Sequence, residues 1–556
     1  MQKTENSSVK IIPLGGLEQI GMNMTAFMYE DSIIVVDCGL SFPDDDMLGI
    51  DLVIPDVTFL KENIDKVKGF VVTHGHEDHI GAFPYVIKEV NKPIYATKLT
   101  MGIIETKFRE HNLLGTTKRK VVTYGQSIIL GKFRVEFIRT NHSIADSCAL
   151  AIHTPAGVIF HTGDFKVDYT PVFGEPIDLQ RFGEIGKKGV LALLCDSTNV
   201  MRPGYTMSEK TVGKTFQTIF DDNPKSRIIV ATFASNVDRV QQIINAACAH
   251  GRKVAVEGRS MVNIINVASE LGYLQIPDGT LIDSEEIKRY PDDKITIITT
   301  GSQGESMAAL SRMAASIHKK VTIKPGDVII VSATPIPGNE KSVARVINEL
   351  SMKGAKVIFQ DTHVSGHASQ EEIKLIYSIL KPKYAVPVHG EYRHLKKHAD
   401  LAKQMGMEPR KIIIPQTGKV IELTKRTIKA RGEVPSGAIM VDGYSVGDVG
   451  VTILRDRRHL AEDGILIVVT AIDRYTGNIV TGPDISTKGF VYAKESEALL
   501  DELAKLAQRS IERCLHRGVT DFETMQTRVR DELNSVIYQR TKRRPMIVPI
   551  FMDFSL

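Results

Sequence analysis

The stretch Thr73-His74-Gly75-His76-Glu77-Asp78-His79 follows directly after the apolar run Gly69-Phe70-Val71-Val72. The apolar run predicts a β-strand, which would bring the polar side chains after it to the edge of a sheet. The spacing H-x-H-x-D-H suits two adjacent transition-metal ions, because the first two histidines can bind one ion while Asp78 and His79 bind the other. Imidazole with carboxylate favours zinc or manganese over magnesium or calcium. The alternative is a polar loop that arose by chance; we interpret the stretch as a metal site.

Three later residues have the placement of additional ligands. His142 follows the β-like segment 133–140, Asp164 ends a predicted hairpin over 148–162, and His389 ends the apolar run 384–388. Open α/β sheets place their sites at the ends of strands, as these residues would be. Each alone is more often a structural polar residue, but together with the first motif they predict a full ligand set.

This set resembles the metallo-β-lactamase superfamily, which carries the same first motif followed by a histidine, an aspartate and a late histidine. The resemblance narrows to the β-CASP branch, because 194–199 (LCDSTN), 363–367 (HVSGH) and 388–391 (VHGE) resemble its three motifs. With these, four further segments make the chain similar to the bacterial ribonuclease J family nearly from end to end. They are Gly15-Gly16, 233–236 (FASN), 300–305 (TGSQGE) and 334–338 (TPIPG).

The resemblance implies an α/β protein, a metallo-β-lactamase αββα sandwich with an inserted β-CASP parallel-sheet domain and a small α+β C-terminal domain. The sequence pattern agrees, because strands alternate with helices from about residue 208 and His389 comes only after that block. We therefore expect the second domain to be inserted into the first. The expected boundaries are 1–207 with 363–437 for the sandwich, 208–362 for the β-CASP domain, 438–454 for a linker and 455–556 for the C-terminal domain.

The C-terminal domain is expected to open at the basic run 455–458 and to contain two strands and two helices. Apolar residues at helical spacing support the first of the helices. The expected elements are a strand over 465–469, helices over about 495–517 and 522–541, and a closing strand over 546–551.

The candidate ligands predict chemistry as well as binding. Asp164 is expected to bridge the two ions, with one oxygen for each. A water held between two divalent ions becomes hydroxide near neutral pH and can attack a phosphorus atom. The leaving alkoxide needs a proton donor, for which His367, oriented by Asp196, is our candidate. The predicted first site is His74, His76 and His142, and the second is Asp78, His79 and His389, with Asp78 counted among the catalytic residues.

Other residues are candidates for holding the substrate. His363, Ser365 and Gly366 could bind phosphate oxygens through imidazole, hydroxyl and backbone N–H groups. The alternative is that His363 and His367 line a domain interface. Phe233 could stack on a base or be ordinary core. Asp37 is a candidate for orienting a ligating histidine, or a turn residue. The complete set of candidate substrate residues is Phe233, Ala234, Ser235, Ser302, Gln303, His363, Val364, Ser365, Gly366 and His367.

Composition fits a large globular enzyme without identifying one. The chain has 556 residues, of which 42% are hydrophobic and 24% charged, and its net charge is +4. Nucleic-acid contacts must therefore come from local basic patches. The five cysteines form no C-x-x-C pair, as expected for reduced thiols in a cytosol. With no run of eighteen apolar residues and no signal peptide, we expect a cytoplasmic protein without a membrane contact.

The ribonuclease J resemblance implies 5′→3′ exonuclease activity preferring a 5′-monophosphate, together with endonuclease activity, in mRNA decay and rRNA maturation. It implies two zinc ions, or manganese, and a structural calcium bound by Gly49, Asp51 and Asp442. It also implies a homodimer or homotetramer, with a homologous subunit and an RNA degradation complex or the ribosome as partners. Two rivals stay open: a small-molecule hydrolase of the lactamase or thioesterase type, and a non-catalytic RNA-binding subunit.

Overall fold

The chain folds into two compact units in the computed structural model. The structure describes residues 8–44, 46–303, 305, 308–335, 339–359, 362–443, 445–473, 476–491 and 496–554. One unit comprises the described residues of 1–42 and 53–439, and the other those of 43–52 and 440–556.

An eight-stranded sheet forms the first layer of the larger unit, in the order β23-β22-β1-β3-β4-β6-β7-β8. Its central strands are almost wholly buried, which explains their continuous apolar sequences. The strands are β1 (Val9–Gly15), β3 (Met24–Tyr29), β4 (Ser32–Val36), β6 (Val67–Val71), β7 (Ile94–Ala96), β8 (Arg119–Val121), β22 (Lys419–Leu423) and β23 (Ile428–Glu433).

A six-stranded sheet packs face to face against the first, in the order β20-β13-β12-β11-β10-β9. Phe27 and Ile34 from one sheet and Phe137 and Leu150 from the other belong to the shared core. The strands are β9 (Ser127–Leu130), β10 (Phe133–Arg139), β11 (Cys148–Thr154), β12 (Gly157–His161), β13 (Val190–Asp196) and β20 (Tyr384–Val388).

Helices cover the sheets. Phe182 of α5 and Ile376 of α11 join Phe160 of β12 in a second core on the far face of the six-stranded sheet. The elements around the two sheets are α1 (Thr58–Glu62), α2 (Glu77–Ile80), α3 (Phe83–Glu89), α4 (Lys98–Glu110), α5 (Leu179–Lys188), α11 (Gln370–Leu380), α12 (Tyr392–Gln404), a 3-10 turn Pro409–Lys411, and the short strands β2 (Leu17–Glu18), β5 (Leu52–Pro55) and β21 (Gly390–Glu391).

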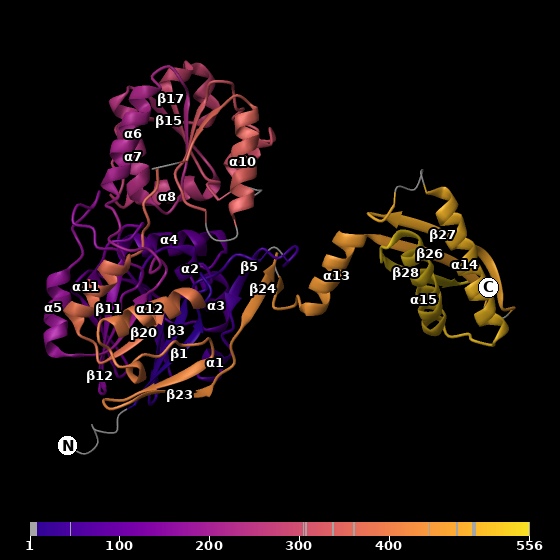
Figure 1. The fold of residues 1–556 in the computed structure, drawn as a ribbon, viewed down its shortest axis with the longest axis horizontal. Helices are drawn as coiled ribbons and strands as arrows, with labels where there is room; N and C mark the ends of the chain where they lie inside the picture. The colour runs from indigo at the N-terminus through magenta and orange to yellow at the C-terminus, as the bar shows by residue number, and fades with distance from the viewer. Residues whose placement is uncertain are drawn as a thin grey trace. The chain divides into compact units, whose positions relative to one another are not determined.

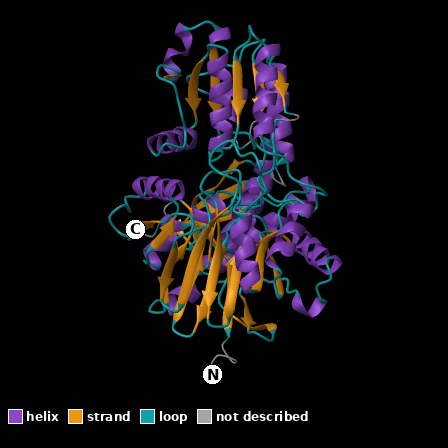
Figure 2. Cartoon of the chain, turned by 90° about the vertical axis from the view of Figure 1, so that its left-hand side faces the viewer, coloured by secondary structure: helices purple, strands orange, loops and turns teal. Residues whose placement is uncertain are grey.

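A separate six-stranded sheet lies in the middle of the sequence, and all its strand pairs are parallel. Its order is β16-β15-β17-β14-β18-β19, with helices on both faces (Figures 1 and 2). The elements are α6 (Lys210–Asp222), β14 (Ile228–Ala231), α7 (Val237–Ala249), β15 (Lys253–Glu257), α8 (Arg259–Glu270), β16 (Leu281–Ile282), 3-10 turns Ser284–Arg289 and Asp292–Lys294, β17 (Ile295–Thr299), α9 (Ala309–Ala314), β18 (Val328–Val331), α10 (Glu340–Met352) and β19 (Lys356–Ile358).

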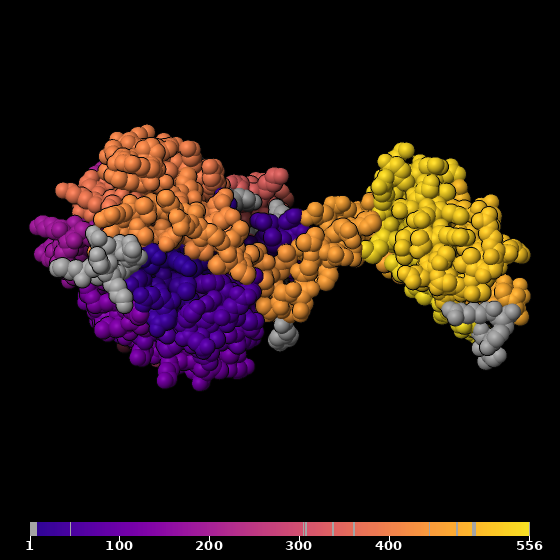
Figure 3. Space-filling view, turned by 90° about the horizontal axis from the view of Figure 1, so that it is seen from below, coloured from indigo at the N-terminus to yellow at the C-terminus, as the bar shows by residue number. Residues whose placement is uncertain are grey.

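After the parallel sheet, the chain returns to the sandwich. β20 pairs in parallel with β13, and β22 pairs antiparallel with β1. Figure 3 shows indigo N-terminal residues beside orange residues from near 400–437 on one face. This topology is a sandwich interrupted by a parallel sheet, which is the architecture the sequence predicts. The residue numbers proposed for the domain boundaries stay predictions.

The smaller unit has a three-stranded sheet in the order β27-β26-β28, packed against two long helices. The expected helix over 522–541 is found with those bounds, while α13 runs through the expected end of the linker at 454. The elements are β24 (Ala438–Asp442), β25 (Ser445–Val446), α13 (Val451–Asp463), β26 (Ile465–Asp473), β27 (Asn478–Lys488), α14 (Glu497–His516), α15 (Phe522–Thr541) and β28 (Met546–Asp553).

Two sequence predictions concern the whole chain. All five cysteines are free thiols, as their scattered positions predict. Among the described residues, no helix combines the length and the apolar character that crossing a bilayer requires.

Candidate metal centre

The seven predicted ligands all lie at or just beyond strand ends. The chain leaves β6 at Val71, so His74 and His76 lie in the loop after it and Asp78 and His79 lie in the following helix α2. His142, Asp164 and His389 follow β10, β12 and β20. His389 has a φ of 55°, a left-handed conformation that is rare for a residue with a side chain and often found at functional sites.

Three imidazoles form the first cluster. His74 Nε2 and His142 Nε2 each lie 3.1 Å from His76 Nδ1. A tetrahedral ion with bonds of about 2.0–2.1 Å holds its ligand atoms about 3.3 Å apart. The spacing of these three nitrogens is therefore that of ligands around one ion.

Two imidazoles and one carboxylate form the second cluster. His389 Nε2 lies 3.2 Å from Asp78 Oδ2, and His79 Nε2 lies 3.5 Å from the same oxygen. These donors again have the separations of a shared coordination sphere.

Asp164 joins the two clusters through a single oxygen. Its Oδ2 is 3.7 Å from His74 Nε2 and 3.8 Å from His142 Nε2 in the first cluster. It is 3.2 Å from His79 Nε2 and 3.4 Å from His389 Nε2 in the second. A carboxylate in this position can bridge two ions.

Polar groups behind the ligands fix the orientation of three rings. His142 Nδ1 donates to the Gly366 carbonyl (2.7 Å), and His79 Nδ1 contacts Asp37 Oδ2 (2.8 Å). His389 Nδ1 contacts Thr198 Oγ1 (2.5 Å). Each contact occupies Nδ1 and leaves Nε2 directed at the cluster, as is usual for metal-ligating histidines.

Burial keeps the first cluster neutral. It lowers the pKa values of His74 and His142 well below the usual range, and that of His76 to about 4. At neutral pH these imidazoles carry no charge, so they have lone pairs for a cation.

Carboxylates make the second cluster ionic. Burial lowers the pKa values of His79 and His389, but Asp164 and neighbouring carboxylates outweigh it, so that of His79 lies well above the usual range and that of His389 is about 10. Burial raises the pKa values of Asp78 and Asp164, but the facing histidines hold both well below the usual range.

The predicted proton donor lies beside the clusters. His367 Nδ1 is 2.8 Å from Asp196 Oδ2 and 3.9 Å from Asp164 Oδ2. Burial lowers the pKa of His367, but Asp196 outweighs it and raises the value above the usual range. The side chain keeps 20% of its surface exposed, so part of the imidazole is accessible to solvent.

The structure brings the segment 363–367 against the ligands. A Cβ on Gly366 would lie 2.7 Å from His142 Cε1, so only glycine allows this approach. The Ser365 hydroxyl accepts from the His367 N–H (3.1 Å), His363 Nδ1 contacts Thr334 Oγ1 (3.1 Å), and Val364 is half-buried.

The other candidate substrate residues follow strands of the parallel sheet. Phe233, Ala234 and Ser235, between β14 and α7, are half-buried. Ser302 and Gln303 are buried, with exposed fractions of 3% and 2%, and Gln303 Nε2 donates to the Thr334 carbonyl. Residues 304 and 336–338 of their motifs lie outside the described residues.

One of the calcium candidates, Asp442, pairs with an arginine. Asp51 Oδ2 accepts from the Gly443 N–H (2.8 Å), and Asp442 pairs with the guanidinium of Arg457. Arg457 also donates to the Leu48 carbonyl beside Gly49. In this structure a guanidinium therefore neutralises Asp442.

Three residues at the centre were missed by the sequence reasoning. Thr73 Oγ1 donates to Asp37 Oδ2 (2.9 Å), and Thr198 Oγ1 contacts His389 Nδ1. Both residues stand in or beside motifs already singled out, so their hydroxyls could have been considered. Asn23 lies in the loop before β3 and donates from Nδ2 to the Asp78 carbonyl (3.0 Å) and to Asp78 Oδ2 (3.2 Å). No spacing or motif in the sequence marks it.

Comparison with known proteins identifies the family. Ribonuclease J2 of Bacillus subtilis (strain 168) is 42% identical over the full length of both chains. The chain belongs to the ribonuclease J family. Ribonuclease J 1 of Streptococcus pyogenes serotype M3 is 43% identical over 98% of each chain, and Ribonuclease J of Thermus thermophilus is 43% identical over 98% of this chain and 95% of that one.

Separate segments match the parts of a ribonuclease J. Residues 23–191 match the metallo-beta-lactamase superfamily, and 225–350 match "Ribonuclease J, beta-CASP domain". Residues 355–415 match "Zn-dependent metallo-hydrolase RNA specificity domain", and 452–554 match "Ribonuclease J C-terminal domain". The predicted family and fold class are confirmed.

One solved structure supports the fold alone. A protein of unknown function from Enterococcus faecalis V583 aligns with a TM-score of 0.53 at 17% identity, over 75% of this chain and all of the other.

Proposed function

We propose that this protein is a ribonuclease that hydrolyses RNA phosphodiesters with two divalent ions, zinc or manganese. The observation that carries the proposal is the position of Asp164 Oδ2 within 3.8 Å of four imidazole nitrogens from two clusters. Nitrogen and carboxylate donors at these separations suit zinc or manganese.

Two ions, when bound, would supply a hydroxide at neutral pH and offset charge on the phosphoryl oxygens. Side chains of the protein carry out the other parts of the reaction. Asp164 and Asp78 supply carboxylate oxygens to the clusters, and Asp196 holds the imidazole of His367 and favours its protonated form. His367 then gives its proton to the departing 3′ oxygen.

The proposal includes 5′→3′ exonuclease activity with a 5′-monophosphate preference, and endonuclease activity. Its support is the placement of Ser365 and Gly366 next to His142, where hydroxyl and backbone groups can meet a terminal phosphate. We further propose mRNA and rRNA precursors as substrates, and a cytoplasmic homodimer or homotetramer with a homologous subunit, a degradation complex or the ribosome as partners. A calcium ion at Gly49, Asp51 and Asp442 would have to displace Arg457 from Asp442.

The test is incubation with 5′-monophosphorylated RNA, with and without a chelator. Release of mononucleotides that the chelator abolishes is the expected result. The variant His76→Ala should lose nearly all cleavage while still binding RNA, and persistence of cleavage would show that the ligand assignment is wrong.

The same experiment separates the rival functions. A small-molecule hydrolase would cleave an ester or lactam and leave the RNA intact. A non-catalytic subunit would bind RNA without cleaving it. Against both stand the complete donor set and the histidine pair of 363–367, which a small-molecule hydrolase does not need.

A further inference from the structure

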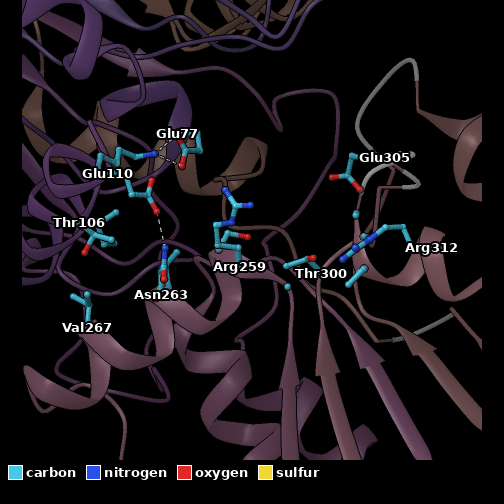
Figure 4. A pocket seen from close by; sticks show the side chains of 17 residues that line it. Glu77, Thr106, Glu110, Arg259, Asn263, Val267, Thr300, Glu305 and Arg312 are labelled. Carbon is cyan, nitrogen blue, oxygen red and sulfur yellow. Dashed lines mark hydrogen bonds and ion pairs between the residues drawn. The ribbon is translucent and has the colours of Figure 1, made fainter. Parts of the chain in front are cut away.

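A cavity of about 580 Å³ lies beside the metal-binding loop, between α4 of the sandwich and α8 of the parallel sheet (Figure 4). Glu77, between the ligands His76 and Asp78, lines one side. The volume falls within the range of about 300–1,000 Å³ that is usual for small-ligand sites.

The strand ends of the parallel sheet form its opposite wall. β15 and β17 are parallel neighbours and finish together, with Glu257 opposite Thr299. Gly258 has a φ of +104°, and a Cβ there would lie 2.5 Å from Thr300 Oγ1, so only glycine permits this close approach. Ligands of open α/β sheets bind at such carboxyl ends.

Two guanidinium groups line the cavity without a carboxylate partner among the described residues. In the described structure no carboxylate pairs with Arg259, at the start of α8, or with Arg312, in α9. The Nε of Arg312 is also buried and has no acceptor among the described residues. Because a buried donor without an acceptor is costly, this N–H indicates that a ligand supplies one.

The other charges of the cavity are mostly neutralised or exposed. Glu77 pairs with Lys107, and Glu110 accepts from Asn263 Nδ2 (2.8 Å). Glu305 is exposed and forms no ion pair with either arginine in the described structure. The two arginines are therefore the cations left for an anionic group, and the backbone N–H groups of the first turn of α8 can add to them.

An apolar wall completes the cavity. Ile103 of α4 and Ile264 and Val267 of α8 line it together. A flat aromatic base could pack on these side chains while an attached phosphate meets the guanidiniums.

We propose that this cavity binds one nucleotide unit, with its phosphate at Arg259 and Arg312 and its base against Ile103, Ile264 and Val267. The proposal rests on the proposed function, because the unit would belong to an RNA strand whose cleavage occurs at the adjacent ions. The same chemistry would also accept a free nucleoside monophosphate, so the test must distinguish the two sources.

The experiment compares wild type with the double variant Arg259→Gln and Arg312→Gln on 5′-monophosphorylated RNAs of increasing length. For RNAs long enough to reach the cavity, KM should rise about tenfold or more while kcat stays within about twofold. A dinucleotide should show no change. The control is Arg289→Gln in the same sheet segment, whose side chain is 73% exposed and pairs with Glu286.

Equilibrium binding of adenosine 5′-monophosphate, measured by calorimetry, provides the second arm. Binding that the double variant loses, with KM unchanged for every RNA, would support the cavity and identify the free nucleotide as its ligand. The proposal is overturned if the double variant changes neither property, or if it impairs the dinucleotide as strongly as long RNA. If wild type cleaves no RNA, the proposed function fails while nucleotide binding remains measurable.

Discussion

The two side-chain clusters of the candidate metal centre lie around one carboxylate oxygen but differ in charge. His74, His76 and His142 are neutral because burial lowers their pKa values. In the second cluster, carboxylates surround His79 and His389 and raise their pKa values. The first cluster can take an ion at once, whereas the second holds protons that an ion must displace.

The difference shows that ligand type alone does not define a metal site. Both clusters contain imidazoles at coordination distance from one another. The carboxylates around each cluster decide whether its imidazoles are protonated before an ion binds. The asymmetry therefore predicts unequal proton release and unequal pH dependence for the two binding steps.

The largest effect is expected from removing the carboxylate charge that the two clusters share. Asp164→Asn takes away the charge at the bridging position, so both sites should lose affinity and RNA cleavage should fall by at least about a thousandfold. Metal content per chain and cleavage rate measure the effect. Asp221→Asn, with a side chain 71% exposed, is the control; loss of only one ion would show that the clusters are independent.

The charge difference itself can be tested through pH. Binding at the second cluster should release up to two protons near pH 7, because the pKa of His389 is about 10 and that of His79 is also raised. Its affinity should then fall by up to about 100-fold per unit as pH decreases. The first cluster, with the pKa of His76 at about 4, should change little between pH 8 and 6.

Calorimetric titration of the metal-free protein in buffers of different ionisation enthalpy counts the protons released in each step. Equal release in both steps would contradict the asymmetry.

A test with a smaller expected effect changes a residue that contacts one ligand of the second cluster. Asp37→Asn replaces the oxygen that contacts His79 Nδ1, and asparagine tolerates the φ of 62° at this position. Affinity should drop by about 10–100-fold at the second site and stay near wild type at the first. Competition with a chromophoric chelator measures both sites, and an equal drop at both would indicate general distortion.

The smallest effect is expected from Thr198→Val. The hydroxyl contacts His389 Nδ1, but Asp196 Oδ1 lies 3.5 Å from the same nitrogen and can partly replace it. Second-site affinity should fall only about two- to tenfold. A loss as large as that of Asp37→Asn would mean that Asp196 gives His389 no support.

The sequence predicted those residues of the centre that stand in or directly after a recognisable strand pattern. The first motif follows a buried strand, and His142, Asp164 and His389 each end a β-like run, so their position at the ends of strands could be foreseen. That these ends come from two different sheets could not be read from the pattern. The family resemblance supplied the inserted sheet. Asn23 could not be foreseen, because its contact with Asp78 spans 55 residues and depends on the packing of two loops.

The sequence also did not predict the partner of one charged residue or the start of one helix. The basic run 455–458 predicts only the start of a domain, but Arg457 within it pairs with Asp442, a calcium candidate. Helix α13 crosses the expected end of the linker because 451–463 has enough helix-forming residues between Gly450 and Gly464. Composition gives neither the partner of a charge nor the end of a helix.

The pairing of β13 with β20 and of β1 with β22 has a consequence for biosynthesis. While a ribosome is still making the middle of the chain, β13 (ending at 196) waits for β20 (starting at 384), and β1 (ending at 15) waits for β22 (starting at 419). Both early sheets therefore present unpaired edges during this part of synthesis. A nascent chain truncated before His389 would also lack a donor for the second ion. Stalled translation products should therefore aggregate easily and retain fewer ions than the finished protein.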